Sequence, residues 1–141
     1  MLINYLRGNK KMKDEILVPV SPGEVIDKIT ILEIKKQFIK DELKLKNISH
    51  EYSLLMNIFN LNFKSIEGIE DLKIRLKKIN LDLWNIEDDI RDCERDKIFD
   101  ANFIKLARSV YITNDQRSKV KMEINLLLNS DLIEEKSYKD Y

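Results

Sequence analysis

The sequence predicts an all-α protein of four main helices, built as two antiparallel helical hairpins in a bundle after a short extended N-terminal segment. Residues 69–141 contain neither glycine nor proline, the residues that punctuate turn-rich β and α/β folds. Apolar residues also recur three and four positions apart over long stretches, which is the period of an amphipathic helix. A chain of 141 residues fits one domain with its own core.

The first helix has the strongest start signal in the chain. Ser21 is a good N-cap, Pro22 suits the first helical position, and Glu24 completes an S-x-x-E capping box. The helical pattern then continues to about Lys40. The second helix is expected from Asp41 to Phe59, and the stretch NLNFKSIEG after it is the expected connection between the two hairpins.

The third helix has the cleanest apolar repeat. Its apolar residues alternate four and three positions apart, as in a coiled coil, at Leu72, Leu76, Ile79, Leu83, Ile86, Ile90 and Cys93. Asp100 is the expected N-cap of the fourth helix, which runs to about Leu127. We therefore expect a single helical-bundle domain over residues 15–130, between an N-terminal extension (1–14, a candidate for disorder) and a charged C-terminal tail (131–141).

Composition excludes several classes of protein. Basic and acidic residues balance at 25 each, so the chain lacks the basic excess typical of nucleic-acid binding. No apolar run reaches the roughly 20 residues of a membrane-spanning helix. Cys93 is the only cysteine and His50 the only histidine, so we expect a cytoplasmic protein with no disulfide framework, metal site or cofactor.

Six acidic residues between Glu87 and Asp96 form the most obvious metal candidate. Metal binding requires carboxylates that converge, but these six point to several sides of the third helix. Arg91 and Arg95 are interleaved with them, and Glu87 lies four residues before Arg91, a favourable spacing for an ion pair. A solvated, salt-bridged helix face is therefore expected.

The fourth helix has a polar interval in its inward-facing stripe between Val110 and Val120. If the last two helices form a hairpin that closes near residue 98, Arg117 lies opposite Asn80. A buried arginine needs an acidic partner, and Asp27 on the first helix is the expected one. The candidate polar site comprises Asp27, Thr30, Arg108, Tyr111, Thr113, Asn114 and Arg117. Both a structural network that fixes helix register and a pocket for a small anionic ligand remain open.

The opposite side of the third helix carries a second apolar group. A helix that is apolar on two sides is central in its fold or meets another chain. The candidate interface of a homodimer comprises Ile74, Leu81, Trp84 and Arg91. Packing of Trp84 against the first or second helix of the same chain is an equally good interpretation.

Four segments, VPVSPGEVIDKITILEIK, LWNIEDDIRDCE, LARSVYITNDQR and EEKSY, resemble an uncharacterised bacterial family of small proteins, sometimes encoded near polysaccharide or glycosyltransferase genes. The resemblance covers residues 15–138 and implies no established activity or catalytic residue. We expect a non-enzymatic binding or assembly protein, and the resemblance implies an accessory role in surface-polysaccharide synthesis. The alternative is a small helical enzyme that acts on an anionic metabolite in a polar pocket between the first, third and fourth helices.

Overall fold

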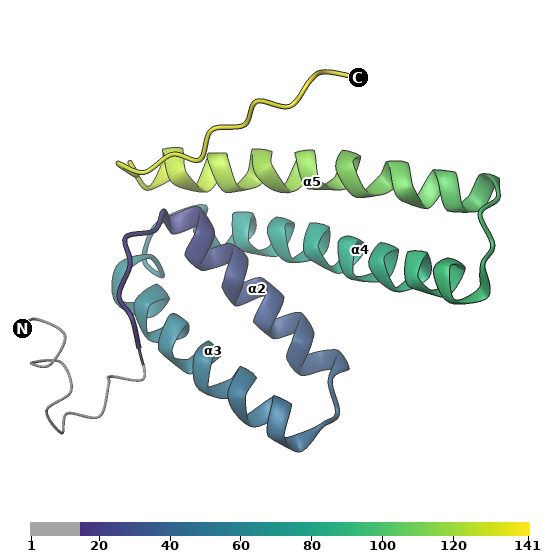
Figure 1. The fold of residues 1–141 in the computed structure, drawn as a ribbon. Helices are drawn as coiled ribbons and strands as arrows, with labels where there is room; N and C mark the ends of the chain where they lie inside the picture. The colour runs from purple at the N-terminus through teal and green to yellow at the C-terminus, as the bar shows by residue number, and fades with distance from the viewer. Residues whose placement is uncertain (1–14) are drawn as a thin grey trace, which may run out of the picture.

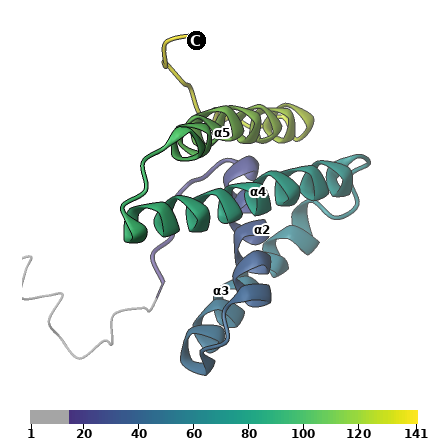
Figure 2. The ribbon, with the colours of Figure 1, turned by 90° about the vertical axis from the view of Figure 1, so that its right-hand side faces the viewer.

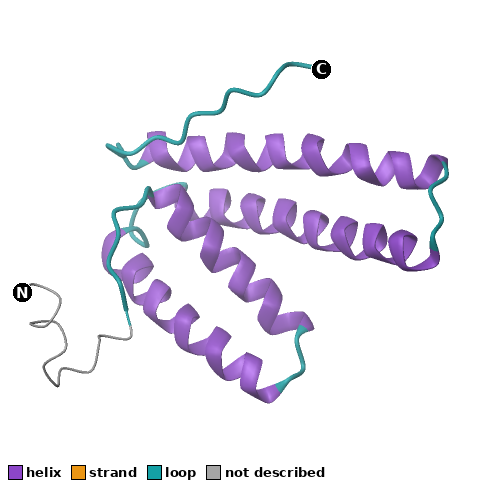
Figure 3. Cartoon of the chain, in the orientation of Figure 1, coloured by secondary structure: helices purple, strands orange, loops and turns teal. Residues whose placement is uncertain are grey.

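The computed structural model describes residues 15–141. These residues form four α-helices, α2 (Pro22–Phe38), α3 (Glu42–Asn62), α4 (Ile69–Asp96) and α5 (Ala101–Leu127). Loops and turns make up the remainder of the described chain, which contains no strand (Figure 3). The predicted all-α class is confirmed. The expected N-terminal extension, residues 1–14, lies outside the described residues.

Helix α2 is the central element, because it packs against α3, α4 and α5. The two longest helices, α4 and α5, lie side by side and are joined by residues 97–100 (Figure 1). The α2–α3 pair lies on one side of α4 and diverges from the α4–α5 pair along its length (Figures 1 and 2). None of the helices in residues 15–141 is both long and apolar enough to cross a membrane.

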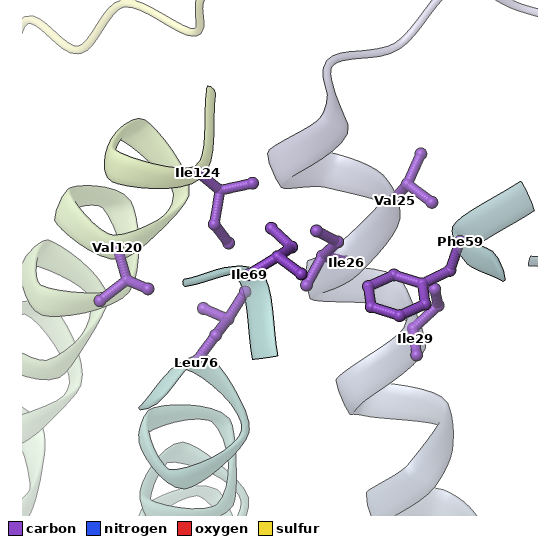
Figure 4. Close-up of a cluster of buried hydrophobic side chains, with 8 residues drawn as sticks. All are labelled: Val25, Ile26, Ile29, Phe59, Ile69, Leu76, Val120 and Ile124. Carbon is purple, nitrogen blue, oxygen red and sulfur yellow. The ribbon is translucent and has the colours of Figure 1, made fainter. Parts of the chain in front are cut away.

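The hydrophobic core sits where α2 and α4 begin and where α3 and α5 end. All four helices contribute to its buried cluster, which consists of Val25, Ile26, Ile29, Phe59, Ile69, Leu76, Val120 and Ile124 (Figure 4). No residue from 81 to 112 is buried. The half of the α4–α5 pair that lies far from this core is therefore held together by half-buried side chains alone.

The N-caps predicted at Ser21 and Asp100 are confirmed, and Asp41, expected as the start of the second helix, is the N-cap of α3. Ser21, Asp41 and Asp100 each accept the backbone N–H three residues ahead, at 3.4, 2.8 and 3.1 Å. The capping box at Ser21, however, forms only in part. The Glu24 carboxylate turns away from the helix start and binds the Lys121 ammonium at 2.5 Å, because α5 passes beside the N-terminus of α2.

Two helix boundaries differ from the expected ones. Helix α2 ends at Phe38, two residues before Lys40, because Ile39 is already extended. Helix α3 continues to Asn62 and takes up the first residues of the expected connection. The connection then ends at Gly68, whose φ of +85° suits glycine directly before α4.

Gly23 lets the start of α2 approach α5 closely. Its backbone N–H donates to the Asn125 Oδ1 at 2.8 Å. A Cβ atom on Gly23 would lie 2.8 Å from the carbonyl oxygen of Lys121. This contact fixes α2 against α5 one turn before Asp27.

Candidate functional site

A buried carboxylate on α2 lies at the centre of the candidate site. Asp27 is 3% exposed, and Arg117 on α5 donates to it twice, from Nε to Oδ1 at 2.9 Å and from Nη2 to Oδ2. Asp27 is thus confirmed as the partner of Arg117. The hydrogen bonding to Asp27 outweighs the effect of burial and raises the pKa of the Arg117 guanidinium.

Asn80 extends this network to α4. Its Nδ2 donates to Asp27 Oδ1 and to Thr30 Oγ1, each at 2.9 Å. The Thr30 hydroxyl donates in turn to the backbone oxygen of Asp27 at 2.8 Å. No buried side-chain nitrogen or oxygen in residues 15–141 lacks a partner. The polar interval of α5 therefore joins three helices through a satisfied network.

Arg117 also presents donors that Asp27 does not occupy. A guanidinium carries five N–H groups, and two of them point to Asp27. The side chain is 29% exposed, so part of it reaches the surface. Arg117 and its neighbour Asn114 line two separate hollows, one on each side of α5.

The first hollow, the interhelical cleft, lies between α2, α4 and α5 and has a volume of about 470 Å³. The apolar lining consists of Ile31, Ile34, Leu83 and Trp84, and the polar lining consists of Asn80, Glu87, Asp88, Arg91, Asn114 and Arg117. One face of the Trp84 ring stacks on Phe38 at 5.6 Å between centroids. The cleft therefore combines an aromatic surface with planar polar side chains.

The second hollow, the strap cavity, lies between α5 and the C-terminal strap, which we define as residues 131–141. It has a volume of about 800 Å³. Three contacts hold the strap along α5 (Figure 1): Glu134 binds Lys121 at 3.1 Å, the Tyr141 hydroxyl donates to Asp115 at 2.8 Å, and the Tyr141 ring meets Tyr111 at 5.0 Å between centroids.

Ion pairs hold the end of the strap that lies nearest the core. The Lys121 side chain is 11% exposed and lies between Glu24 and Glu134. Burial alone would lower the pKa of Lys121, but the hydrogen bonds to both carboxylates outweigh it and raise the pKa. Hydrogen bonds from Lys136 and Lys121 lower the pKa of Glu134 to about 2. Both partners are thus held in their charged forms.

A second charged contact ties α2 to α4. Glu33 accepts from Lys73 and Lys77, each at 2.9 Å. Burial raises the pKa of the Glu33 carboxyl, yet the hydrogen bonds from Lys77 and Lys73 outweigh it and leave the pKa below its ordinary value. This cluster and the Asp27 network therefore fix α2 against α4 at two points.

The structure brings together only some of the residues predicted for the polar site. Asp27, Thr30 and Arg117 are hydrogen-bonded in one network, and Asn114 and Tyr111 line the adjoining hollows. Arg108 is exposed and lines neither hollow. Thr113 is buried, but no hydrogen bond within residues 15–141 joins its side chain to Asp27. These two residues lie outside the arrangement.

Two members of the arrangement were absent from the predicted site. Asn80 lies four residues after Leu76 and three before Leu83, so its place on the inward stripe of α4 was a usable signal. Lys121 lies four residues after Arg117 and adjoins Val120. The sequence did not predict the burial of Lys121, because a lysine next to an apolar stripe usually extends to solvent.

The predicted interface residues on α4 have different surroundings, and Leu81 is half-buried. Ile74 is 65% exposed, Arg91 pairs with Glu87 at 2.7 Å, and Trp84 stacks on Phe38 of α2. Packing within the chain, one of the two interpretations, thus accounts for Trp84. The homodimer remains a prediction.

The acidic run of α4 forms short ion pairs along the helix. Besides Arg91 and Glu87, Arg95 binds Asp92 at 2.8 Å and Lys97 binds Glu94 at 2.6 Å. Within the described chain, no three histidine, cysteine, aspartate or glutamate side chains converge as metal ligands would. The run is therefore a salt-bridged face, as its spacing predicts.

A family model, described as a family of unknown function, matches residues 13–141. No curated protein matches the chain, and no solved structure matches it. The family match confirms the resemblance to an uncharacterised domain.

Proposed function

The chain belongs to DUF6165, a family of unknown function, and we propose that it is a non-enzymatic binding module whose interhelical cleft binds a polyhydroxylated, sugar-like ligand. The observation that carries this proposal is the combination of Trp84 with planar polar side chains around one hollow of about 470 Å³. Ligand pockets are mostly apolar hollows with a few well-placed polar groups. Sugar rings present both C–H faces and paired hydroxyls to such a surface.

The polar groups of the cleft can both donate and accept hydrogen bonds. Asn114 and the outer edge of Arg117 supply donors. Asp88 supplies acceptors, since its carboxylate makes no ion pair with any described residue. Alcohol groups both donate and accept, so they match this mixture better than a purely anionic ligand does.

The Asp27 network supports recognition rather than proton transfer. The two carboxylate oxygens of Asp27 accept N–H groups from Arg117 and Asn80, and the Thr30 hydroxyl is used by a backbone oxygen. A general base needs an oxygen within reach of substrate, and Asp27 is buried behind its donors. The network instead orients Arg117 before any ligand arrives, which reduces the entropic cost of binding.

The resemblance to proteins encoded near polysaccharide genes agrees with this ligand class. We place the module, as a proposal, in an accessory role in surface-polysaccharide synthesis. The alternative is a small enzyme that acts on an anionic metabolite through Arg117, Arg108 and Asn114. Two of these residues, Arg117 and Asn114, line the cleft, whereas Arg108 does not. An enzyme of that kind would convert its ligand on incubation, whereas a binding module returns the ligand unchanged.

A glycan array probed with the full chain tests the proposal, and titrations of the retained glycans follow the emission of Trp84. Trp84 is the only tryptophan, so its emission reports this cleft. We expect Asp88→Ala to weaken binding at least about ten-fold. The matched control, Asp92→Ala, removes an exposed aspartate one turn further along α4, outside the cleft.

The proposal fails if no glycan on the array changes the Trp84 emission, or if Asp88→Ala and Asp92→Ala weaken binding equally. Circular dichroism of both variants verifies that the helices persist. Mass spectrometry of the recovered glycan decides between binding and turnover.

A further inference from the structure

The strap cavity is a second hollow, distinct from the interhelical cleft, and it is large enough for a small molecule. Its volume of about 800 Å³ falls in the range of ligand sites, roughly 300–1,000 Å³. Helix α5 forms one wall and the strap forms the other, so its chemistry depends on both.

The acidic groups of this cavity are already bound by the protein. Glu24 accepts from Lys121, Glu134 accepts from Lys121 and Lys136, and Asp115 accepts from the Tyr141 hydroxyl. These three carboxylates line the cavity together with four cationic side chains. Asp27, which also pairs with Arg117, brings the carboxylates to four, so the charges balance. Each of the three lining carboxylates already accepts at least one hydrogen bond.

The groups of the lining that remain available are mainly donors. Lys139 makes no ion pair within residues 15–141, and Arg117 also lines this cavity. The Ser118 hydroxyl and the Asn114 amide, both on α5, are two further donor groups in the lining. Such a set requires an acceptor-rich ligand group, and phosphate and carboxylate are the groups that arginine and lysine bind best.

Three aromatic rings and Val110 supply the rest of the lining. Tyr111 comes from α5, and Tyr138 and Tyr141 come from the strap. The rings of Tyr111 and Tyr141 already meet edge to face, while Tyr138 is 78% exposed. Tyrosine rings favour contact with a flat or cyclic apolar body.

We infer that the strap cavity binds a small molecule in which a phosphate or carboxylate group is carried on a ring. Arg117, Lys139 and the Ser118 hydroxyl hold the anionic group, and the tyrosine rings pack against the ring. The strap supplies Lys139, Tyr138 and Tyr141, so the site is complete only when the strap lies along α5.

Titration of the full chain with phenyl phosphate and with benzoate, followed by amide shifts in two-dimensional NMR, tests the inference. We expect at least one of them to bind about ten-fold more tightly than both inorganic phosphate and benzyl alcohol. The tighter of the two probes identifies the anionic group. Lys139→Gln should weaken this binding about five-fold or more, by loss of a charge-assisted contact.

Lys105→Gln is the matched control, since Lys105 is an exposed lysine of α5 outside the cavity. A chain that stops at Ser130 still contains the residues of all four helices and should lose the binding; circular dichroism verifies that its helices persist. The inference is overturned if Lys139→Gln and Lys105→Gln behave alike, if the shortened chain binds equally well, or if benzyl alcohol binds as tightly as both anions. Asp88→Ala should leave this site unchanged, which separates it from the interhelical cleft.

Discussion

Replacement of Arg117 by methionine should destabilise the fold more than simultaneous replacement of Arg117 and Asp27 by apolar residues. The single change leaves the Asp27 carboxylate, whose side chain is 4% exposed, without its charged partner. Breaking a buried ion pair in this way costs about 3–5 kcal/mol. Asn80 would still donate to Asp27, so the lower half of this range is expected.

The double variant Asp27→Leu, Arg117→Met removes both charges and leaves no buried carboxylate. Asn80 then loses one acceptor and keeps Thr30, which costs about 1–3 kcal/mol for an incompletely satisfied polar group. We therefore expect the double variant to be more stable than Arg117→Met alone. A non-additive pair of this kind is what direct contact produces.

Urea unfolding followed by the emission of Trp84 measures both variants. Trp84 stacks on Phe38, so unfolding separates the rings and alters the emission. The reasoning is refuted if Arg117→Met costs less than about 1 kcal/mol, the range of an exposed ion pair, or if the two changes add without coupling.

Three further predictions concern other parts of the fold. Gly23→Ala should lower the free energy of unfolding by about 1–3 kcal/mol, since the new Cβ would lie 2.8 Å from the Lys121 carbonyl oxygen. Thermal unfolding measures this loss, and an unchanged Tm would contradict it. Glu134 should titrate near its lowered pKa of about 2 in carboxyl ¹³C NMR, and a midpoint above 4 would refute this. Its contribution to the free energy of unfolding is therefore present above pH 4.5 and disappears as the pH falls towards 2. Because the side chain is partly exposed, this contribution is less than about 1 kcal/mol. Asp100→Ala removes the cap of α5 and should cost about 1 kcal/mol in urea, whereas no change would show that the cap is dispensable.

The helices were predictable because their signals are local. Caps at Ser21, Asp41 and Asp100 and the apolar period of α4 depend on residues within a few positions of one another. The end of α2 and the extension of α3 were harder to predict, because short-range patterns locate helix ends only to within a few residues. The capping box forms only in part because Glu24 binds Lys121, which lies 97 positions away in the chain. A contact over that distance cannot be predicted from a local pattern.

The pairing of Asp27 with Arg117 was predictable for a different reason. A charge on an inward stripe must be compensated, and Asp27 was a rare acid on the apolar side of the first helix. The strap cavity was not predictable, because residues 131–141 carry no helical period that would place them along α5. Arg108 is exposed and lines neither hollow, because no third helix covers this part of α5.

Arg117 and Asn114 belong to the walls of both hollows. If both proposed sites bind, a side chain shared in this way couples them thermodynamically. A ligand that draws the free edge of Arg117 to one side of α5 removes a donor from the other side. Linkage requires the effect to be mutual: whatever factor the first ligand imposes on the second, the second imposes on the first.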